Sequence, residues 1–185
     1  MIMRERAYAR VSFWGDTMKP RLLTICAAGI LVSGCLKERP KDDTAQSIQQ
    51  IRQLFDGWAK AFEAKDVDGV MAMYAPNITA FDIVPPLQFR GADAYRKDYS
   101  EFFAQFSGPI HVEIPNMQIE VNGDTAFAYG LERIAAKMTN GAPVDMWLRY
   151  TEGLKRIDGH WRVVHEHISV PADMATGKAA TNLKP

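Results

Sequence analysis

The sequence predicts one α+β domain, in which three N-terminal helices pack on the concave face of a curled, cone-shaped antiparallel sheet. Apolar residues recur at helical spacing between residues 43 and 106, whereas turn dipeptides separate long β-rich runs between residues 110 and 170. The strand parity also slips at Pro115-Asn116, which is typical of a β-bulge, and a bulge lets a sheet curl.

Two helices are expected first. The first helix begins at Asp43 or Thr44, because either side chain can cap a helix end. Its apolar residues recur at spacings of three and four and so share one stripe: Ile48, Ile51, Phe55, Trp58 and Phe62. A second, short helix is expected to begin at Asp66 and to bury Tyr74 before Pro76 stops it.

A third helix is expected over residues 91–106. Its inward face is aromatic and comprises Tyr95, Tyr99, Phe102, Phe103 and Phe106. Residues 78–89 lie between the second and third helices and are broken by Pro85-Pro86. Since proline is tolerated only at edges and bulges of a sheet, this segment is expected to form two short strands on a rim.

Four antiparallel strands are expected in the C-terminal half. Hairpin turns are indicated at Asn122-Gly123, Asn140-Gly141 and Asp158-Gly159, because these residue types accept the positive φ of tight turns. The strands are expected over residues 110–121, 125–136, 144–156 and 160–170. The tail over residues 172–185 is small and polar, so we expect it to be disordered.

The N-terminal segment resembles a bacterial lipoprotein signal. An uncharged run over residues 22–32 follows Lys19 and Arg21 and is too short to span a ~30 Å hydrocarbon core. The run ends in Ser33-Gly34-Cys35, which resembles a lipobox, so Cys35 is expected to become the lipidated N-terminus. We expect translation to start at Met18, because the segment before it carries acidic residues.

The resemblance to a lipoprotein signal implies a domain organisation and a location in the cell. Residues 1–35 are an extension and signal peptide, residues 36–42 a tether, and residues 43–171 the folded domain. The residue after the lipidated cysteine is Leu36, and the absence of Asp there resembles the pattern of outer-membrane lipoproteins. We therefore expect a membrane-bound protein, anchored by lipid to the outer membrane and facing the periplasm.

Charge and cysteine content argue against a nucleic-acid-binding protein and against a domain stabilised by disulfides. Residues 36–185 carry 17 basic and 20 acidic residues, a net charge of about −3, which argues against nucleic acid as a partner. Cys26 leaves with the signal and Cys35 carries the lipid, so no disulfide stabilises the domain. Stability is therefore expected to come from the apolar core.

The order helix, helix, rim, helix and four-stranded meander resembles the nuclear-transport-factor-two-like superfamily over residues 43–171. That superfamily includes ketosteroid isomerases, SnoaL-like polyketide cyclases and the association domains of calmodulin-dependent kinases, and the SnoaL-like branch resembles this chain most. The specific pieces are Lys65-Asp66-Val67-Asp68 with Met73-Tyr74-Ala75, Ala80-Phe81-Asp82 to Phe89-Arg90-Gly91, and Asp158-Gly159-His160-Trp161 to His165-Glu166-His167-Ile168-Ser169.

The resemblance to ketosteroid isomerases implies a general base at Asp82. It also implies a tyrosine donor where this chain has Trp58, and an indole N–H can donate a hydrogen bond but cannot share a proton as a phenol does. The family's sheet aspartate falls near Gly153, beside Glu152. This chain thus keeps one of the three catalytic residues of the ketosteroid isomerases. A second hypothesis is that Asp82 is a capping or turn residue whose carboxylate accepts hydrogen bonds from backbone N–H groups.

Other residues are expected to line the cavity of the cone. The candidate ligand-binding residues are Trp58, Tyr74, Tyr99, Tyr150, Glu152, Glu166 and Ile168. Tyr74 and Tyr99 are equally explained as core rings that send a hydroxyl to the cavity edge. The arginines of the kinase association domains are missing at the positions that match Glu152 and Ile168, so a pocket for carboxylates is not expected.

His165 and His167 lie two apart on one strand and so share a face, together with Trp161. A metal site would need a third protein ligand, so no metal is expected, and nothing in the sequence indicates a cofactor. The resemblance implies that this face points away from the cavity, and a β-bulge in either strand would exchange the two faces. We expect Trp161, His165 and His167 to pack against a second copy of the chain in a homodimer.

Three functions are compatible with these observations. The leading hypothesis is a periplasmic, lipid-anchored SnoaL-like domain that binds a small, largely apolar molecule in the cone cavity. The second is an isomerase, cyclase or dehydratase that uses Asp82 as general base, which would require a perturbed pKa at Asp82. The third is an envelope protein-interaction module whose cavity is filled by packing.

Overall fold

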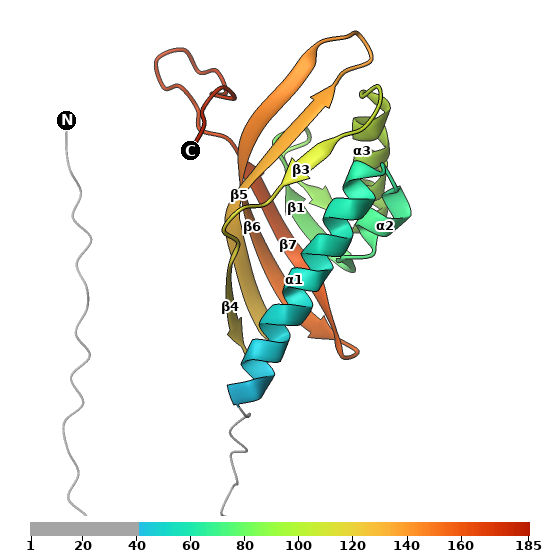
Figure 1. The fold of residues 1–185 in the computed structure, drawn as a ribbon, viewed down its shortest axis with the longest axis vertical. Helices are drawn as coiled ribbons and strands as arrows, with labels where there is room; N and C mark the ends of the chain where they lie inside the picture. The colour runs from blue at the N-terminus through green and yellow to red at the C-terminus, as the bar shows by residue number, and fades with distance from the viewer. Residues whose placement is uncertain (1–40) are drawn as a thin grey trace, which may run out of the picture. The chain divides into compact units, whose positions relative to one another are not determined.

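The computed structural model describes residues 41–185, so the predicted extension, signal peptide and lipidated Cys35 lie outside the described residues. Three helices precede most of the sheet, as predicted (Figure 1). The helices are α1 (Lys41–Glu63), α2 (Val67–Met71) and α3 (Ala92–Ala104). The strands are β1 (Tyr74–Phe81), β2 (Phe89–Arg90), β3 (His111–Glu113), β4 (Gln118–Asn122), β5 (Thr125–Lys137), β6 (Pro143–Ile157) and β7 (His160–Ser169).

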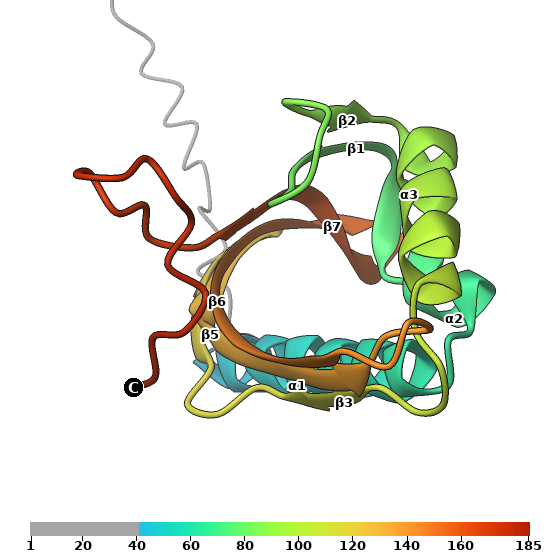
Figure 2. The same ribbon diagram turned by 90° about the horizontal axis from the view of Figure 1, so that it is seen from above.

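The strands form one curled, unclosed sheet in the order β2-β1-β7-β6-β5-β3, and β4 also pairs with β5. Neighbouring strands are antiparallel except for β1 and β7, which run parallel. The sheet bends around α1 and α3, which lie on its concave side (Figure 2). The predicted fold class is therefore confirmed, and the parallel pairing of the first and last long strands was not predicted.

The apolar stripe of α1 faces the sheet. Ile51, Phe55 and Phe62 are at most 4% exposed and belong to the same core as the inward residues of the strands. Burial of each such side chain stabilises the fold by roughly 1.5–3 kcal/mol. The stripe thus fixes which face of α1 lies over the concave side of the sheet.

The second helix is shorter than predicted. Asp66 caps α2 by accepting a hydrogen bond from the Gly69 N–H at 3.1 Å, but the helix ends at Met71, and Tyr74 to Pro76 already belong to β1. Pro76 falls in the stretch of β1 between Tyr74 and Thr79 where the pairing with β7 is irregular. A proline is tolerated there because no regular ladder hydrogen bond is required of it.

Two irregularities give the sheet its curl. The predicted slip at Pro115-Asn116 divides the first run into β3 and β4, which both pair with β5, and Asn116 has a positive φ of 58°. A further shift lies between β6 and β7, where Leu154 pairs with Val163 but Gly153 pairs with His165. This leaves Val164 as an extra residue, and from that point on the inward positions of β7 change parity.

The shift at Val164 corrects one prediction. Trp161 lies before it and is only 4% exposed within the core, whereas His165 and His167 lie after it on the opposite, outer face. The parity argument that placed Trp161 on one face with the two histidines is therefore wrong. Trp161 instead packs beneath Arg156, whose guanidinium carbon lies 4.5 Å from the centre of the indole ring.

The tail after β7 contains neither a helix nor a strand. Ala172 and Ala179 form an isolated bridge, and the Asp173 carboxylate accepts hydrogen bonds from the N–H groups of Ala175 and Thr176. Its disorder stays a prediction. None of the helices in residues 41–185 has the length and apolar character that crossing a bilayer would require.

Candidate functional site

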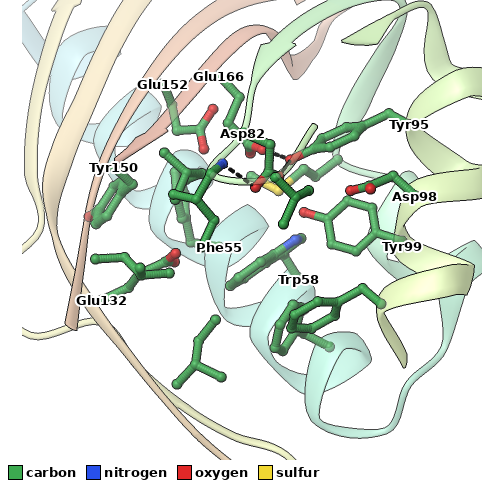
Figure 3. Close-up of a pocket in the computed structure, with 18 residues that line it drawn as sticks. Phe55, Trp58, Asp82, Tyr95, Asp98, Tyr99, Glu132, Tyr150, Glu152 and Glu166 are labelled. Atoms are coloured by element: carbon green, nitrogen blue, oxygen red, sulfur yellow. Dashed lines mark hydrogen bonds between the residues drawn. The ribbon is translucent and has the colours of Figure 1, made fainter. Parts of the chain in front are cut away.

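A cavity of about 70 Å³ lies between α1, α3 and the concave face of the sheet (Figure 3). The lining combines apolar side chains with polar ones from α3, β5, β6, β7 and the end of β1. The lining residues are Phe55, Trp58, Phe62, Met73, Asp82, Ile83, Val84, Tyr95, Asp98, Tyr99, Phe102, Glu132, Ile134, Leu148, Tyr150, Glu152, Glu166 and Ile168.

The helix side of the cavity is aromatic. Phe55, Trp58 and Phe62 follow each other at helical spacing along the buried stripe of α1 and so share one wall. The rings of Trp58 and Phe62 are 4.9 Å apart, and Phe55 lies 5.9 Å from Tyr150 of β6. A flat, apolar group would find ring faces and edges on this side.

The sheet side of the cavity is acidic. Glu132, Glu152 and Glu166 occupy inward positions of β5, β6 and β7 and are 3–6% exposed. Glu152 and Glu166 face each other as a register pair on neighbouring strands. Two ionised carboxylates on such neighbouring positions inside an apolar core repel each other strongly, so the pair favours the uptake of a proton.

The Glu166 carboxylate is held by phenols from two other elements. Tyr74 of β1 donates to Glu166 Oε2 at 2.6 Å, and Tyr95 of α3 donates to Glu166 Oε1. The hydroxyl of Tyr99 lies 2.7 Å from that of Tyr74 and extends the chain of hydrogen bonds. Burial raises the pKa of Glu166, while its hydrogen bonds with Glu152, Tyr74 and Tyr95 oppose that rise.

Tyr95 connects Glu166 to the rim. Its hydroxyl lies 2.9 Å from Oδ2 of Asp82 and also contacts Glu166 (Figure 3). A phenol carries a single proton and can donate only one of these hydrogen bonds. When one of the two carboxyl groups holds a proton, it can donate that proton to the Tyr95 oxygen, and Asp82 and Glu166 then share one proton through Tyr95. Burial raises the pKa of both carboxyl groups and so favours this state.

Asp82 combines the two alternatives that the sequence leaves open. Its Oδ1 accepts a hydrogen bond from the Ile83 N–H at 2.6 Å, as a turn residue would. Burial raises the pKa of Asp82 above its usual value, although hydrogen bonds from Tyr95 and from the Ile83 and Val84 N–H groups oppose this shift. Asp82 is thus a structured rim residue and also a perturbed carboxyl that lines the cavity.

The remaining acids have raised pKa values as well. Burial raises the pKa of Glu132 to about 8, with smaller contributions from the charges of Glu166 and Asp82. Burial, then the charge of Glu166, raises the pKa of Glu152 well above its usual value. The pKa of Asp98 on α3 rises to about 6, first through burial and then through Asp82. At neutral pH burial therefore favours the neutral form of Glu132 and Glu152, which can donate as well as accept hydrogen bonds, whereas Asp98 is mostly ionised.

Three buried polar atoms of the cavity lining have no partner within the described part of the chain. They are Nε1 of Trp58, the hydroxyl of Tyr150 and Oε2 of Glu152. A buried polar group without a partner costs about 1–3 kcal/mol. Trp58 Nε1 and Glu152 Oε2 thus remain as a donor and an acceptor for a molecule in the cavity, whereas the Tyr150 hydroxyl lies over Gly130 of β5.

The structure brings most of the predicted site residues together. Asp82, Trp58, Tyr99, Tyr150, Glu152, Glu166 and Ile168 all line the cavity, whereas Tyr74 lies behind Glu166 and reaches it only through its hydroxyl. His165 and His167 lie on the outer face of β7, where both rings contact Phe81 and Nδ1 of His165 is 2.9 Å from the Thr79 carbonyl oxygen. The functional roles assigned to these residues stay predictions.

Sequence reasoning missed three lining residues as functional candidates. Glu132 occupies an inward position of β5, in the same alternating pattern as the buried residues Ala128 and Ile134. An acidic residue at an inward position of a strand indicates a polar group in the core, so the sequence did contain a signal for it. Tyr95 was expected to face inward, but its bridge between two carboxyls depends on contacts that no local pattern encodes. Asp98 lies one helical turn from Tyr95 at the cavity edge and gave no sequence signal.

The acids do not converge on a metal position. Among residues 41–185, no group of three or more His, Cys, Asp or Glu side chains has an arrangement that could hold a metal ion. The side chains that line the cavity offer hydrogen bonds and carboxyl groups that can exchange protons.

Comparisons with known proteins agree with this architecture. The family model of the SnoaL-like domain matches residues 51–173. An NTF2-like protein of unknown function from Pseudomonas putida KT2440 is 35% identical, with 77% of this chain and 99% of that chain covered and a TM-score of 0.70.

Two more distant structures share the fold. A ketosteroid isomerase-like protein from Erwinia carotovora atroseptica is 17% identical over 67% of this chain and 95% of that chain, with a TM-score of 0.59. A candidate scytalone dehydratase from Novosphingobium aromaticivorans is 15% identical over 68% and 84% of the two chains, with a TM-score of 0.62.

Proposed function

The chain belongs to the SnoaL-like domain family, and we propose that its cavity binds a small, largely apolar molecule that carries a polar group. The observation that carries this proposal is the set of unpartnered polar atoms on residues that line the cavity: Trp58 Nε1, the Tyr150 hydroxyl and Glu152 Oε2. A domain that needed only to fold would be more stable with apolar atoms there. A bound molecule recovers this cost by completing the hydrogen bonds.

The size of the cavity limits the molecule. A volume of about 70 Å³ is below the roughly 300–1,000 Å³ typical of pockets for drug-sized ligands. A cavity of about 150 Å³ is known to hold a benzene ring, so even a single ring with a short polar substituent requires the rim to move. The rim residues Ile83 and Val84 are 39% and 38% exposed.

The proposal includes a place for the protein in the cell. The lipobox-like Ser33-Gly34-Cys35 supports a lipid anchor, and Leu36 supports the outer membrane with the domain facing the periplasm. The outer face of the sheet supports a homodimer, because Phe81 remains 38% exposed there beside His165 and His167. An exposed aromatic cluster on a sheet is a suitable contact for a second copy.

Native mass spectrometry of protein extracted from its own membrane tests the binding proposal. We expect the extracted protein to retain a small molecule. The proposal would be contradicted if the protein carried no such molecule and also failed to bind small aromatic molecules added to it. Trp58→Phe removes the open indole donor and should weaken binding by about 0.5–1.5 kcal/mol. Trp161→Phe is the matched control, because its Nε1 is also buried without a partner but lies outside the cavity.

A specific observation favours a second candidate, an isomerase, cyclase or dehydratase. Asp82 has a raised pKa and shares a proton with Glu166 through Tyr95, so it can accept a proton from a substrate and pass charge to a second carboxyl. In this candidate Asp82 is the general base and the neutral carboxyl groups hydrogen-bond the developing oxyanion.

Deuterium exchange separates the two candidates. If Asp82 moves a proton, the retained molecule should take up deuterium from D₂O, and Asp82→Asn should abolish this uptake while the fold and much of the affinity remain. If the protein only binds, no uptake occurs and Asp82→Asn changes affinity by about one hydrogen bond, ~0.5–1.5 kcal/mol. A lower melting temperature with unchanged binding would identify Asp82 as a structural cap.

A further inference from the structure

The cavity is lined by acidic side chains without basic ones. Five acidic side chains line it: Asp82, Asp98, Glu132, Glu152 and Glu166. Among the described residues that form this lining, none is a lysine, arginine or histidine. Acids that are fully buried in proteins are normally paired with a cation or a metal. Here hydrogen bonds from Tyr74 and Tyr95 account for Glu166, and Glu166 in turn is hydrogen-bonded with Glu152, but Oε2 of Glu152 has no partner in the described residues.

The cation that acts on this part of the cavity is bound elsewhere. Burial, then the charges of Glu132 and Glu152, raise the pKa of the Tyr150 phenol, and the charge of Arg52 of α1 opposes this rise. Its guanidinium donates instead to the Met117 carbonyl oxygen at 3.3 Å. The two glutamates of β5 and β6 therefore have no positive partner from the helix that covers them.

Glu152 also carries an open acceptor. The residue is 3% exposed, its Oε2 has no hydrogen-bond partner in the described residues, and its carboxyl group points into the cavity (Figure 3). The wall opposite consists of Phe55 and Trp58, and Tyr150 stands beside them. Aromatic faces next to buried carboxyls are the surroundings that organic ammonium groups favour, because ring quadrupoles and negative oxygens both attract a cation.

We infer that the natural ligand is a small organic cation, a protonated amine on an apolar or aromatic body, whose ammonium group lies between Glu132 and Glu152 against Trp58. This inference names the ligand class of the site and so rests on the proposed binding function. The ammonium group donates to Glu152 Oε2, and the body of the ligand occupies the aromatic side. The ligand supplies the positive charge that the cavity lacks.

Binding of such a cation should release a proton. Without the ligand, Glu132 and Glu152 are protonated near neutral pH, because burial and the neighbouring acids Asp82 and Glu166 raise their pKa values. The other titratable groups of the lining are Asp98, Tyr95 and Tyr99 of α3 and the phenol of Tyr150, and none of them supplies a positive charge. An entering ammonium ion stabilises a carboxylate, so affinity should rise with pH while the amine stays protonated.

Three isosteric probes test the inference with the purified full chain: benzylammonium, benzyl alcohol and benzoate. They share one ring and differ in charge, and intrinsic tryptophan fluorescence can follow each titration because Trp58 lines the cavity. We expect benzylammonium to bind at least about tenfold more tightly than benzyl alcohol at pH 8. Its affinity should increase between pH 6 and pH 8, by up to about tenfold per pH unit, while that of benzyl alcohol stays constant.

Two variants connect the effect to the carboxyl groups. Glu152→Gln and Glu132→Gln keep the shape of the side chain but cannot ionise, so each should reduce benzylammonium affinity about tenfold or more and flatten its pH dependence. Benzyl alcohol affinity should change less than about threefold. The matched control is Glu120→Gln, which removes an exposed carboxylate of β4 outside the cavity.

The outcomes separate this inference from the function on which it rests. If benzyl alcohol binds as tightly as benzylammonium at every pH, or benzoate binds best, the cation inference is wrong and binding of small apolar molecules stands. If none of the three probes enters the cavity, both proposals fail. The wild-type titrations alone decide between these results, even where a glutamine variant does not fold.

Discussion

Replacing Glu132 with glutamine should make the stability of the protein less sensitive to alkaline pH. Glu132 is 6% exposed, and its pKa rises from 4.5 to about 8 through burial, then through the charges of Glu166 and Asp82. A carboxyl whose pKa is raised on folding keeps its proton more tightly in the folded state than in the unfolded state. Its contribution is therefore fully present below pH 4.5 and is lost as the pH rises through 8.

The size of the effect follows from the two pKa values. Each pKa unit corresponds to about 1.36 kcal/mol, so the wild type should lose roughly 5 kcal/mol through Glu132 across the whole window. Roughly 3 kcal/mol of that loss should fall between pH 6 and pH 9. Since 1 kcal/mol shifts the melting temperature of a domain of this size by about 2–4 °C, the corresponding shift is about 6–12 °C.

Urea denaturation at pH 6, 7, 8 and 9 measures this loss for the wild type and for Glu132→Gln. The introduced amide resembles the protonated carboxyl group in shape and neutrality, so the variant should gain roughly 3 kcal/mol relative to the wild type between pH 6 and pH 9. Part of the alkaline loss should persist in both proteins, because Asp82, Glu152 and Glu166 also have raised pKa values. Stability curves that remain parallel over this range would refute the argument that Glu132 is a buried neutral acid.

Further predictions concern other parts of the fold. Gly130→Ala should cost about 1–3 kcal/mol of stability, because the new Cβ would lie 3.0 Å from the Tyr150 hydroxyl; a stability equal to wild type in thermal denaturation would contradict this. Tyr95→Phe should cost about 1–3 kcal/mol, and more as the pH rises, since Asp82 and Glu166 lose their shared donor; a loss independent of pH would argue against the shared proton. Cys35→Ala should leave an uncleaved or soluble precursor, and mass spectrometry that finds an intact Met18 start in envelope fractions would disprove lipidation. Sedimentation at micromolar concentration should report a dimer, and a strictly monomeric protein would mean that His165 and His167 do not form an interface.

The sequence carried the fold because its signals are local. Helical spacing of apolar residues, turn dipeptides and the slip at Pro115-Asn116 each depend on neighbours along the chain, and all three appear in the structure. The shift at Val164 has no such signal, since Val163 and Val164 are equally suited to either face of a strand. For this reason the position of Trp161 was predicted wrongly although the strand itself was predicted well.

The candidate site was predictable in its composition but not in its connections. Asp82, Glu152 and Glu166 could be placed near the cavity from resemblance and strand parity. The sharing of a proton between Asp82 and Glu166 depends on Tyr95, which comes from a helix and meets both only after the sheet has curled. Burial and mutual repulsion, which set the pKa values, arise from that three-dimensional arrangement.

The parallel pairing of β1 with β7 has a consequence for the order of assembly. Ala80 pairs with Glu166, so the strand that carries Tyr74 reaches its partner about 90 positions later in the sequence (|i−j| = 92 for the bond between Tyr74 and Glu166). Contacts between such distant segments form late, because the intervening chain must first be brought together. A nascent chain that ends before β7 lacks both the strand that pairs with β1 and the carboxyl group of Glu166. Tyr95 can then contact Asp82 but no second carboxyl group. A chain truncated before β7 therefore carries Asp82, Glu132 and Glu152 but cannot form the hydrogen bonds that Tyr74 and Tyr95 make with Glu166.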